Sequence, residues 1–341
     1  MRPAAAVSVQ TESLDWRPSG TAAALAARAR MLACIRGFFE QRDVLEVETP
    51  ILSRSATTDP ALSSLRTRYA GPGSAGGRTL YLHTSPELPM KRLLAAGSGP
   101  VYQVCKVFRD GERGRLHHPE FSLLEWYRPG WGIGALMDEV AELVRAVLGR
   151  PEMTAEHVGY RRLFRERLDV DPWRADAAGL RDRARALGVA EADGLDLDRD
   201  GWLDLLLTRF IEPGLGRGGM TFVHGYPPSQ AALARITTVA DGPSVVQVAE
   251  RFELYIDGVE LANGFQELTA AHEQRARFET DLAERAANGQ VQPPIDDAFL
   301  AALAAGLPDC AGVALGLDRL LMIATGARHI DEVLAFPVER A

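Results

Sequence analysis

An Asp257-Gly258 pair separates two segments in which apolar and polar residues alternate, 252–256 and 259–262. Asp-Gly is a strong signal for the two-residue turn of an antiparallel hairpin. This turn fixes the register of the two strands, which places Glu253 and Glu260 on one face at a diagonal distance of about 7 Å. We therefore expect an antiparallel sheet with two glutamates close together on it.

These two carboxylates repel each other unless a cation lies between them. A hydrated Mg²⁺ ion carrying phosphates is the natural candidate, because it prefers a few carboxylates together with substrate oxygens. Glu253 and Glu260 are thus candidate metal ligands. The alternative is a pair of solvated glutamates on an open sheet face, and the spacing alone does not decide between the two.

The rest of the 341-residue chain mixes helical and strand patterns. Apolar residues at helical spacing predict helices, whereas short alternating segments predict strands. We expect helices at 21–43, 91–96, 133–148, 160–167, 177–187, 202–211 and 318–324, and strands at 44–48, 79–83, 101–109, 121–127, 221–224, 252–262 and 312–316. Hairpin-linked strands with helices collected elsewhere indicate an α+β fold, with an antiparallel sheet flanked by helices.

The domain organisation that we expect is a flexible tail over 1–20 followed by one domain over 21–341, with a helical insertion at about 150–245. No apolar run reaches the roughly 20 residues of a membrane span. The formal net charge of −8 argues against a protein that coats nucleic acid. Cys34, Cys105 and Cys310 show no metal-ligand spacing and suit a reduced, cytoplasmic compartment.

A second informative stretch extends from Phe108 to Tyr127. On a strand, Phe121, Glu125 and Tyr127 share one face, so a carboxylate and a phenol look into the same space. A lone glutamate on a strand is more often a solvated edge residue than a ligand. The strand therefore offers a candidate binding face without establishing one.

A third stretch, from Gly312 to Arg319, combines small residues with an arginine at the start of a predicted helix. Small residues let a strand approach a ligand closely, and fixed positive charge at a helix start suits phosphates. Two glycines at this spacing more often serve packing than binding. No Walker loop or dinucleotide fingerprint is present in the sequence, so ATP would need another kind of site.

Motif by motif, the chain resembles the class II aminoacyl-tRNA synthetases. The predicted helix and strand that end at Pro50 are similar to motif 1, 108–127 to motif 2, and 312–319 to motif 3. Thr84-Ser85-Pro86-Glu87 with 90–93, and the segment 262–268, resemble the lysine branch. The resemblance implies a class II synthetase core, a two-fold homodimer, and activation of a lysine-like amino acid by ATP with Mg²⁺.

The same resemblance implies roles for individual residues. ATP binding is implied for Arg109, Asp110, Gly111, Glu112, His118, Phe121, Glu260, Leu261, Gly316 and Arg319. Amino-acid binding is implied for Ser85, Pro86, Glu87, Glu125, Tyr127, Asn263, Glu267 and Ala314. Arg109 and Arg319 would be catalytic, because they would neutralise charge on the α-phosphate and on the leaving pyrophosphate. Glu253 and Glu260 would hold Mg²⁺.

Two residues depart from that pattern, and one point of strand geometry needs an explanation. Motif 2 usually reads Arg-x-Glu, but here Gly111 takes the third position and Glu112 follows it. His118 stands where the family has asparagine. On a regular strand, Glu260 and Asn263 could not face the same pocket, so we expect a β-bulge at Asn263-Gly264.

Only a short tail stands before Thr21, where lysyl-tRNA synthetases carry an anticodon-binding domain. This arrangement resembles the elongation factor P–lysine ligases, which attach (R)-β-lysine to a lysine of that translation factor. The resemblance implies elongation factor P as partner, lysine or β-lysine as substrate, and no stable transfer-RNA binding. Ala314, where synthetases usually have glycine, favours (R)-β-lysine. The competing hypotheses are a truncated synthetase that charges transfer RNA or a small acceptor, and a non-catalytic lysine-binding paralogue.

Overall fold

The computed structural model describes residues 16–74, 76–241 and 244–341. Its helices are α1 (Ala22–Glu40), α2 (Glu87–Ala95), α3 (Ile133–Leu148), α4 (Tyr160–Leu168), α5 (Ala177–Ala186), α6 (Arg199–Leu206), α7 (Ala271–Ala287), α8 (Asp297–Gly306) and α9 (Leu317–Thr325). Its strands are β1 (Leu45–Glu46), β2 (Leu52–Ser53), β3 (Arg66–Tyr69), β4 (Arg78–Leu82), β5 (Val101–Phe108), β6 (Glu120–Pro129), β7 (Ala155–Gly159), β8 (Met220–Tyr226), β9 (Ile236–Asp241), β10 (Ser244–Ile256), β11 (Val259–Gln266) and β12 (Cys310–Gly316).

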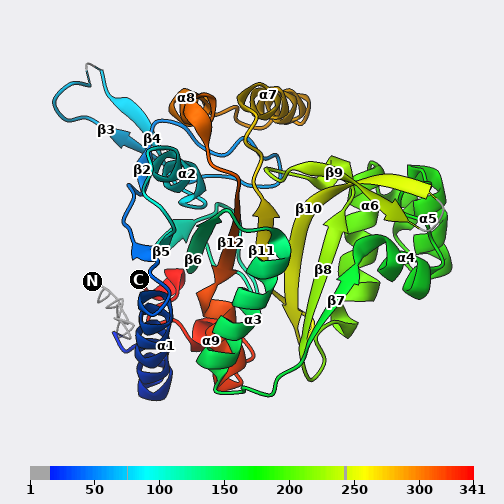
Figure 1. Ribbon diagram of the computed structural model, residues 1–341, viewed down its shortest axis with the longest axis horizontal. Coiled ribbons are helices and arrows are strands. Elements are labelled where there is room, and N and C mark those ends of the chain that lie inside the picture. The colour runs from blue at the N-terminus through cyan, green and yellow to red at the C-terminus, as the bar shows by residue number, and fades with distance from the viewer. Residues whose placement is uncertain (1–15, 75, 242–243) are drawn as a thin grey trace, which may run out of the picture.

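One large sheet organises the fold (Figure 1). Its strands follow the order β1-β5-β6-β12-β11-β10-β8-β7, with β9 paired to β10, while β2, β4 and β3 form a small separate sheet. The central pairs are antiparallel, but β1 with β5 and β7 with β8 are parallel. The predicted α+β class is confirmed, and the parallel outer pairs make the sheet mixed rather than wholly antiparallel.

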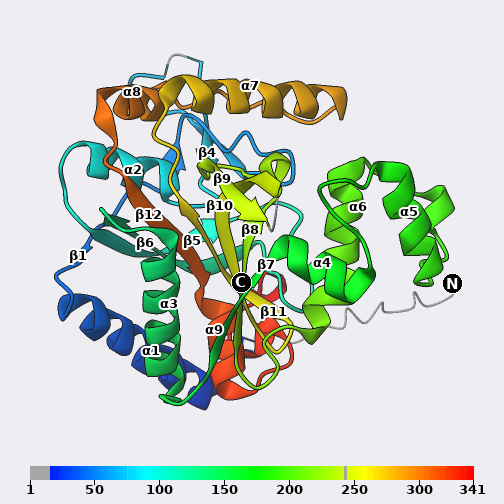
Figure 2. The same ribbon diagram turned by 45° about the vertical axis from the view of Figure 1, so that its right-hand side comes forward.

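The two faces of the sheet are covered by different helices. Leu124 and Trp126 of β6 are fully buried in a core that also contains side chains of α1, α3 and α9. Tyr127 points to the opposite face and packs with Met90 of α2 and Phe299 of α8. Figure 2 shows α7 and α8 grouped at one end of the molecule, with α1 and α9 at the other. This alternation along β6 confirms the face assignment made from the sequence.

A second core lies between the helices of the predicted insertion at 150–245 and the large sheet. Side chains of α4, α5 and α6, including Phe164, Leu180 and Trp202, pack together and against Tyr226 of β8 and Tyr255 of β10. In Figure 2 these three helices stand apart from the other helices. The stretch 150–245 also supplies β7, β8 and β9 to the large sheet. It is therefore a mixed unit built onto the sheet and not a wholly helical insertion.

The two ends of the described chain meet. Residues 1–15 of the expected tail lie outside the described residues, so the prediction for them stays a prediction. The backbone N–H of Ser19 donates to the carbonyl of Ala335 at 2.8 Å, and Gly20 is buried against Leu334. The packed chain therefore begins before Thr21, the residue at which we expected it to start.

A β-bulge in the hairpin of β10 and β11 explains how Glu260 and Asn263 can lie on the same face of the sheet. Leu254 pairs with Ala262 and Tyr255 with Glu260, so Leu261 is the extra residue of β11. The bulge brings Glu260 onto the face that carries Asn263. The expectation of a bulge was correct, but its position at Asn263-Gly264 was wrong, because the register slips nearer the turn.

Candidate active site

A cavity of about 1460 Å³ lies on the face of the sheet that carries Tyr127. It brings together most of the predicted site residues: Ser85, Glu87, Arg109, Glu112, His118, Phe121, Glu125, Tyr127, Glu260, Leu261, Asn263, Glu267, Ala314, Gly316 and Arg319. Four others are not part of its lining, namely Pro86, Asp110, Gly111 and Glu253. Asp110 instead borders a smaller cavity of about 260 Å³.

The floor of the cavity is formed by three adjacent strands in register. Ala314 of β12 lies directly between Glu125 of β6 and Asn263 of β11. Two residues along, Gly312 pairs with Tyr127. A Cβ atom on Gly312 would lie 2.3 Å from the Tyr127 ring and 2.5 Å from Glu267. Only glycine therefore lets the phenol and that carboxylate meet above the strand.

One end of the cavity is rich in buried carboxylates. The hydroxyl of Ser85 donates to Oε1 of Glu125 at 2.5 Å, and the hydroxyl of Tyr127 donates to its Oε2 at 3.1 Å. Burial, together with the nearby charge of Glu87, raises the pKa of Glu125 to about 8. Burial likewise raises the pKa of Glu267, although the ammonium group of Lys91 opposes the shift. We call Glu87, Glu125, Glu267 and Tyr127 the amine end, because anions held out of water favour a cation.

Lys91 lies behind this end. Its Nζ atom is ion-paired with Glu87, one helical turn earlier on α2, and with Oε2 of Glu267. Burial alone would lower the pKa of Lys91, but the charges of Glu267 and Glu87 outweigh it and raise the pKa. Sequence reasoning missed this residue, although the i, i+4 spacing from Glu87 signals the pair.

The other end of the cavity is built from two arginines and an aromatic ring. We call Arg109, Phe121 and Arg319 the phosphate end, because the sequence predicts that these arginines contact the phosphates of ATP. The guanidinium of Arg109 lies over the ring of Phe121, 5.0 Å from its centre. Nη1 of Arg109 also lies 3.5 Å from Oε1 of Glu112. Glu112 thus reaches the cavity although it comes one residue later than in the family pattern. Gly111 has a φ of +81°, in the left-handed region that favours glycine, and this conformation shapes the turn.

Arg319 connects the motif 2 loop to the hairpin of β10 and β11. It donates to the backbone carbonyl of Glu260 at 2.9 Å and to the carbonyl of Leu116 at 3.2 Å. Its Nη2 lies 2.8 Å from Nε2 of His117. Burial and the charge of Arg319 lower the pKa of His117, so its neutral ring can accept this hydrogen bond. The arginine therefore aligns the motif 2 loop with the hairpin.

The predicted metal ligands are not equivalent. Oε2 of Glu253 accepts hydrogen bonds from Tyr226 at 2.6 Å and Tyr255 at 2.5 Å, and Arg251 pairs with its other oxygen. Glu260 lies 3.3 Å from Arg319 at the cavity wall. Among the described residues, no group of three or more His, Cys, Asp or Glu side chains is arranged to hold a metal.

The charge around this pair nevertheless suits a cation. Burial and the charges of Glu253 and Glu260 raise the pKa of the neighbouring Glu212 to about 7. Carboxylate oxygens are the donors that Mg²⁺ prefers. The donor set fits the ion, with Glu260 placed to contact it and Glu253 held by protein donors that it would have to release. Metal binding by this pair stays a prediction.

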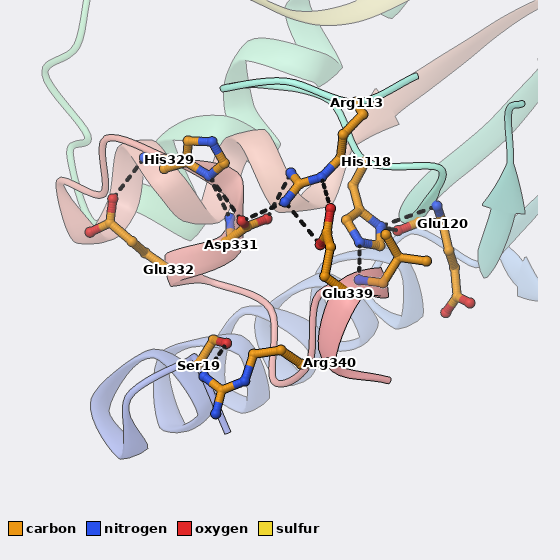
Figure 3. Close-up of polar contacts among 10 residues, drawn as sticks. Ser19, Arg113, His118, Glu120, His329, Asp331, Glu332, Glu339 and Arg340 are labelled. Carbon is orange, nitrogen blue, oxygen red and sulfur yellow. Dashed lines mark hydrogen bonds and ion pairs between the residues drawn. The ribbon is translucent and has the colours of Figure 1, made fainter. Parts of the chain in front are cut away.

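The motif 2 loop is fastened to the end of the chain, as Figure 3 shows. Arg113 donates to Asp331 at 2.8 Å and to Glu339 at 2.7 Å. Nδ1 of His118 lies 2.5 Å from the Glu120 carbonyl, and its Nε2 accepts from the N–H of Val338 at 2.9 Å. Because both ring nitrogens are engaged, His118 would have to exchange these bonds to contact ATP.

The chain is similar to known proteins over nearly its whole length. A family model described as tRNA synthetases class II (D, K and N) matches residues 5–340. Proteins named elongation factor P--(R)-beta-lysine ligase from Pectobacterium atrosepticum, Klebsiella pneumoniae and Salmonella paratyphi B are each 50% identical over 331 residues. The alignments cover 97% of this chain and 100% of each relative. The family match includes every cavity-lining residue named above.

Proposed function

Because this chain belongs to the class II tRNA synthetases (D, K and N) and, within them, to the elongation factor P–(R)-β-lysine ligases, we propose that it joins (R)-β-lysine to elongation factor P. The resemblance inferred from the motifs is thereby confirmed at the level of the family. The acceptor would be the side-chain amine of one lysine in that factor. We infer the substrate and the acceptor from the names of the relatives.

The observation that carries this proposal is the polarity of the cavity. Three buried or half-buried carboxylates, Glu87, Glu125 and Glu267, face one end, and Arg109 and Arg319 face the other. A diamino acid has two ammonium groups and one carboxylate. Charge complementarity orients such a substrate with its amines among the glutamates and its carboxylate towards the arginines.

The first step would be formation of an aminoacyl-adenylate. The substrate carboxylate, already ionised, attacks the α-phosphorus of ATP, and the bond to pyrophosphate breaks. Arg109 would neutralise the charge that develops on the α-phosphate, while Arg319 would hold the departing pyrophosphate. Phe121, whose ring lies beside Arg109, would stack on adenine. Mg²⁺, when bound near Glu260, would supply positive charge to the phosphates.

The second step would transfer the acyl group. The neutral amine of the acceptor lysine attacks the carbonyl carbon of the adenylate, an amide bond forms, and AMP leaves with the electron pair of the broken C–O bond. The amine releases its proton in the process. Holding donor and acceptor together in the cavity lowers the barrier by making the step effectively intramolecular.

We also propose a homodimer, a cytoplasmic location and no stable transfer-RNA binding. A dimer is supported by two exposed apolar side chains along the segment that resembles motif 1, Leu25 and Leu45, and by Ile51 directly after it. Among the described residues, all three cysteines are free thiols, which suits a reducing compartment. No helix in the described part of the chain is long and apolar enough to span a membrane.

Two measurements on one preparation test the proposal. Pyrophosphate exchange into ATP should depend on (R)-β-lysine or lysine, and intact-mass spectrometry should find one lysine unit added to elongation factor P. A transfer-RNA aminoacylation assay runs in parallel. Efficient charging of transfer RNA with an unmodified factor would favour the truncated synthetase. No exchange, combined with measurable lysine binding, would favour the non-catalytic paralogue.

A further inference from the structure

We propose that Lys91 is a positioning residue for the amino-acid substrate, because it fixes the spacing between two of the carboxylates that receive the substrate's ammonium groups. These carboxylates are Glu87 and Glu267, and the inference rests on the function proposed above. Lys91 would not touch the substrate. It would act by holding its two partners from the side that faces the protein.

The geometry places Lys91 behind the cavity wall. Its side chain is 1% exposed and does not line the cavity, whereas Glu87 and Glu267 both do. Its Nζ contacts Oε1 of Glu87 and Oε2 of Glu267, and the Phe299 ring lies 5.9 Å away. Lys91 thus contacts the two carboxylates from the side that faces away from the cavity. Their cavity side remains available for a ligand.

The two carboxylates belong to different parts of the fold. Glu87 begins α2, while Glu267 follows the last residue of β11 and is held by a backbone hydrogen bond to Cys310 on β12. Lys91 therefore ties a helix to the sheet at the point where both contribute to the site. The distance between the sites that bind the two amino groups depends on this tie. The tie should therefore affect which diamino acid is preferred, since isomers carry their amino groups at different positions.

The charge count supports the same role. With the substrate's ammonium groups bound, the carboxylates are held ionised; Glu87, Glu125 and Glu267 then bring three negative charges and Lys91 one positive charge, which leaves two negative charges. Two is the number of ammonium groups in a diamino acid. Without Lys91, a third buried anion would be uncompensated, and one carboxylate would bind a proton instead of the substrate.

A purely structural ion pair is the competing explanation. A buried ion pair contributes little net stability compared with apolar residues of the same size, because desolvation offsets the attraction. Apolar packing is readily available here, since α2 already packs through Met90 and Leu94. A charge that faces two cavity-lining carboxylates is better explained by the site than by the core.

The first test compares Lys91→Met with Lys106→Met in amino-acid-dependent pyrophosphate exchange. Lys106 is the other lysine of the sequence, 43% exposed and paired with Glu120 at 3.6 Å, so it is a matched control. In Lys91→Met, the KM for (R)-β-lysine should rise roughly tenfold or more, as expected when one partner of a buried charge pair is removed. The KM for ATP should change less than about twofold, and Lys106→Met should leave both values unchanged.

The second test is chemical rescue. Lys91→Ala removes the side chain beyond Cβ, and n-propylammonium supplies the missing atoms with their charge, whereas 1-propanol supplies them without it. Exchange by Lys91→Ala should recover with the amine and not with the alcohol, and the amine should not activate the unmodified enzyme. Equal recovery with both compounds would mean that the site needs volume and not charge, which would overturn the proposal.

The outcomes separate this inference from the proposed function. Failure of the unmodified enzyme to exchange pyrophosphate would defeat the function itself. Normal exchange by the unmodified enzyme with an unchanged KM for (R)-β-lysine in Lys91→Met would defeat only the role of Lys91. If Lys91→Met is insoluble, Lys91→Arg gives the answer, since the longer forked cation keeps the charge but alters the spacing. It should change the ratio of kcat/KM for (R)-β-lysine to that for α-lysine, and an unchanged ratio would overturn the proposal.

Discussion

The two ends of the cavity are built in different ways. Glu125 and Glu267 of the amine end are at most 2% exposed, as is Lys91 behind them, while Glu87 at its edge is 19% exposed. At the phosphate end, the side chains of Arg109 and Arg319 are 27% and 20% exposed. Water cannot replace a lost partner of Glu125, Glu267 or Lys91, whereas it can at the phosphate end. Substitutions at the amine end should therefore change mainly the selectivity for the amino acid. Substitutions at the phosphate end should change mainly kcat for pyrophosphate exchange.

The largest effect is expected from Glu267→Gln, which leaves Lys91 paired with Glu87 alone and takes one counter-charge away from the substrate ammonium. Breaking a buried pair costs about 3–5 kcal/mol. Calorimetric titration should find that amino-acid affinity falls by a corresponding factor, while ATP affinity is nearly retained. A thermal unfolding scan of the variant serves as a control. An equal fall in the affinity for the amino acid and for ATP would indicate misfolding. It would contradict the proposed difference between the two ends.

Arg109→Ala should show the opposite pattern. One preorganised charge on a transition state is worth about 2.7–4 kcal/mol, so kcat for pyrophosphate exchange should fall roughly 10²–10³-fold. The KM for the amino acid should change far less than kcat, because Glu87, Glu125 and Glu267 still bind its ammonium groups. Arg162→Ala, which removes an exposed arginine from α4, is the control. Near-normal exchange by Arg109→Ala would remove the role assigned to it.

Binding of the amino acid at the amine end should also depend on pH. Glu125 has a pKa of about 8 in the free site, so at pH 7 its carboxyl group is largely protonated and cannot pair with an ammonium group. Amino-acid affinity should rise roughly tenfold between pH 6.5 and pH 8, where alkylammonium groups stay charged, and level off above the pKa. Isothermal titration in two buffers of different ionisation enthalpy would detect the released proton. Glu125→Gln should weaken the pH dependence, and what is left would come from Glu267, whose pKa burial raises to about 7.

The smallest effect is expected from Ala314→Gly, which removes one methyl group from the cavity floor between Glu125 and Asn263. One methylene-sized change in a pocket is worth about 1–3 kcal/mol of discrimination. The ratio of kcat/KM for (R)-β-lysine to that for α-lysine should fall, with ATP parameters unaltered. Competition between the two isomers in a single exchange assay measures this ratio directly. An unchanged ratio would contradict the specificity assigned to Ala314.

Much of the fold could be read from local patterns. The Asp257-Gly258 turn, the alternation along β6 and the apolar stripe of α1 each set an element through residues adjacent in sequence. Long-range features could not be obtained in this way. The parallel pairing of β7 with β8 joins strands between which the chain forms the three helices α4, α5 and α6, and no local signal specifies it.

The site shows the same division. Spacing and resemblance identified Glu125, Glu267 and Arg319, which do line one cavity. They did not identify Lys91, whose partners come from separate elements, or the position of the bulge at Leu261, which depends on a one-residue slip of register. They also did not reveal that Glu253 is surrounded by Tyr226, Tyr255 and Arg251. These features arise from tertiary packing and not from sequence spacing.

The burial of Lys91 has a practical consequence for labelling the protein. Of the two lysines in the sequence, one is sealed behind the cavity and the other, Lys106, is 43% exposed. Apart from the amino terminus, an amine-reactive dye therefore has a single surface side chain to modify. Any reactive adenylate that escaped the cavity would acylate this same side chain. Peptide mapping at Lys106 would thus record leakage of the intermediate without an added trap.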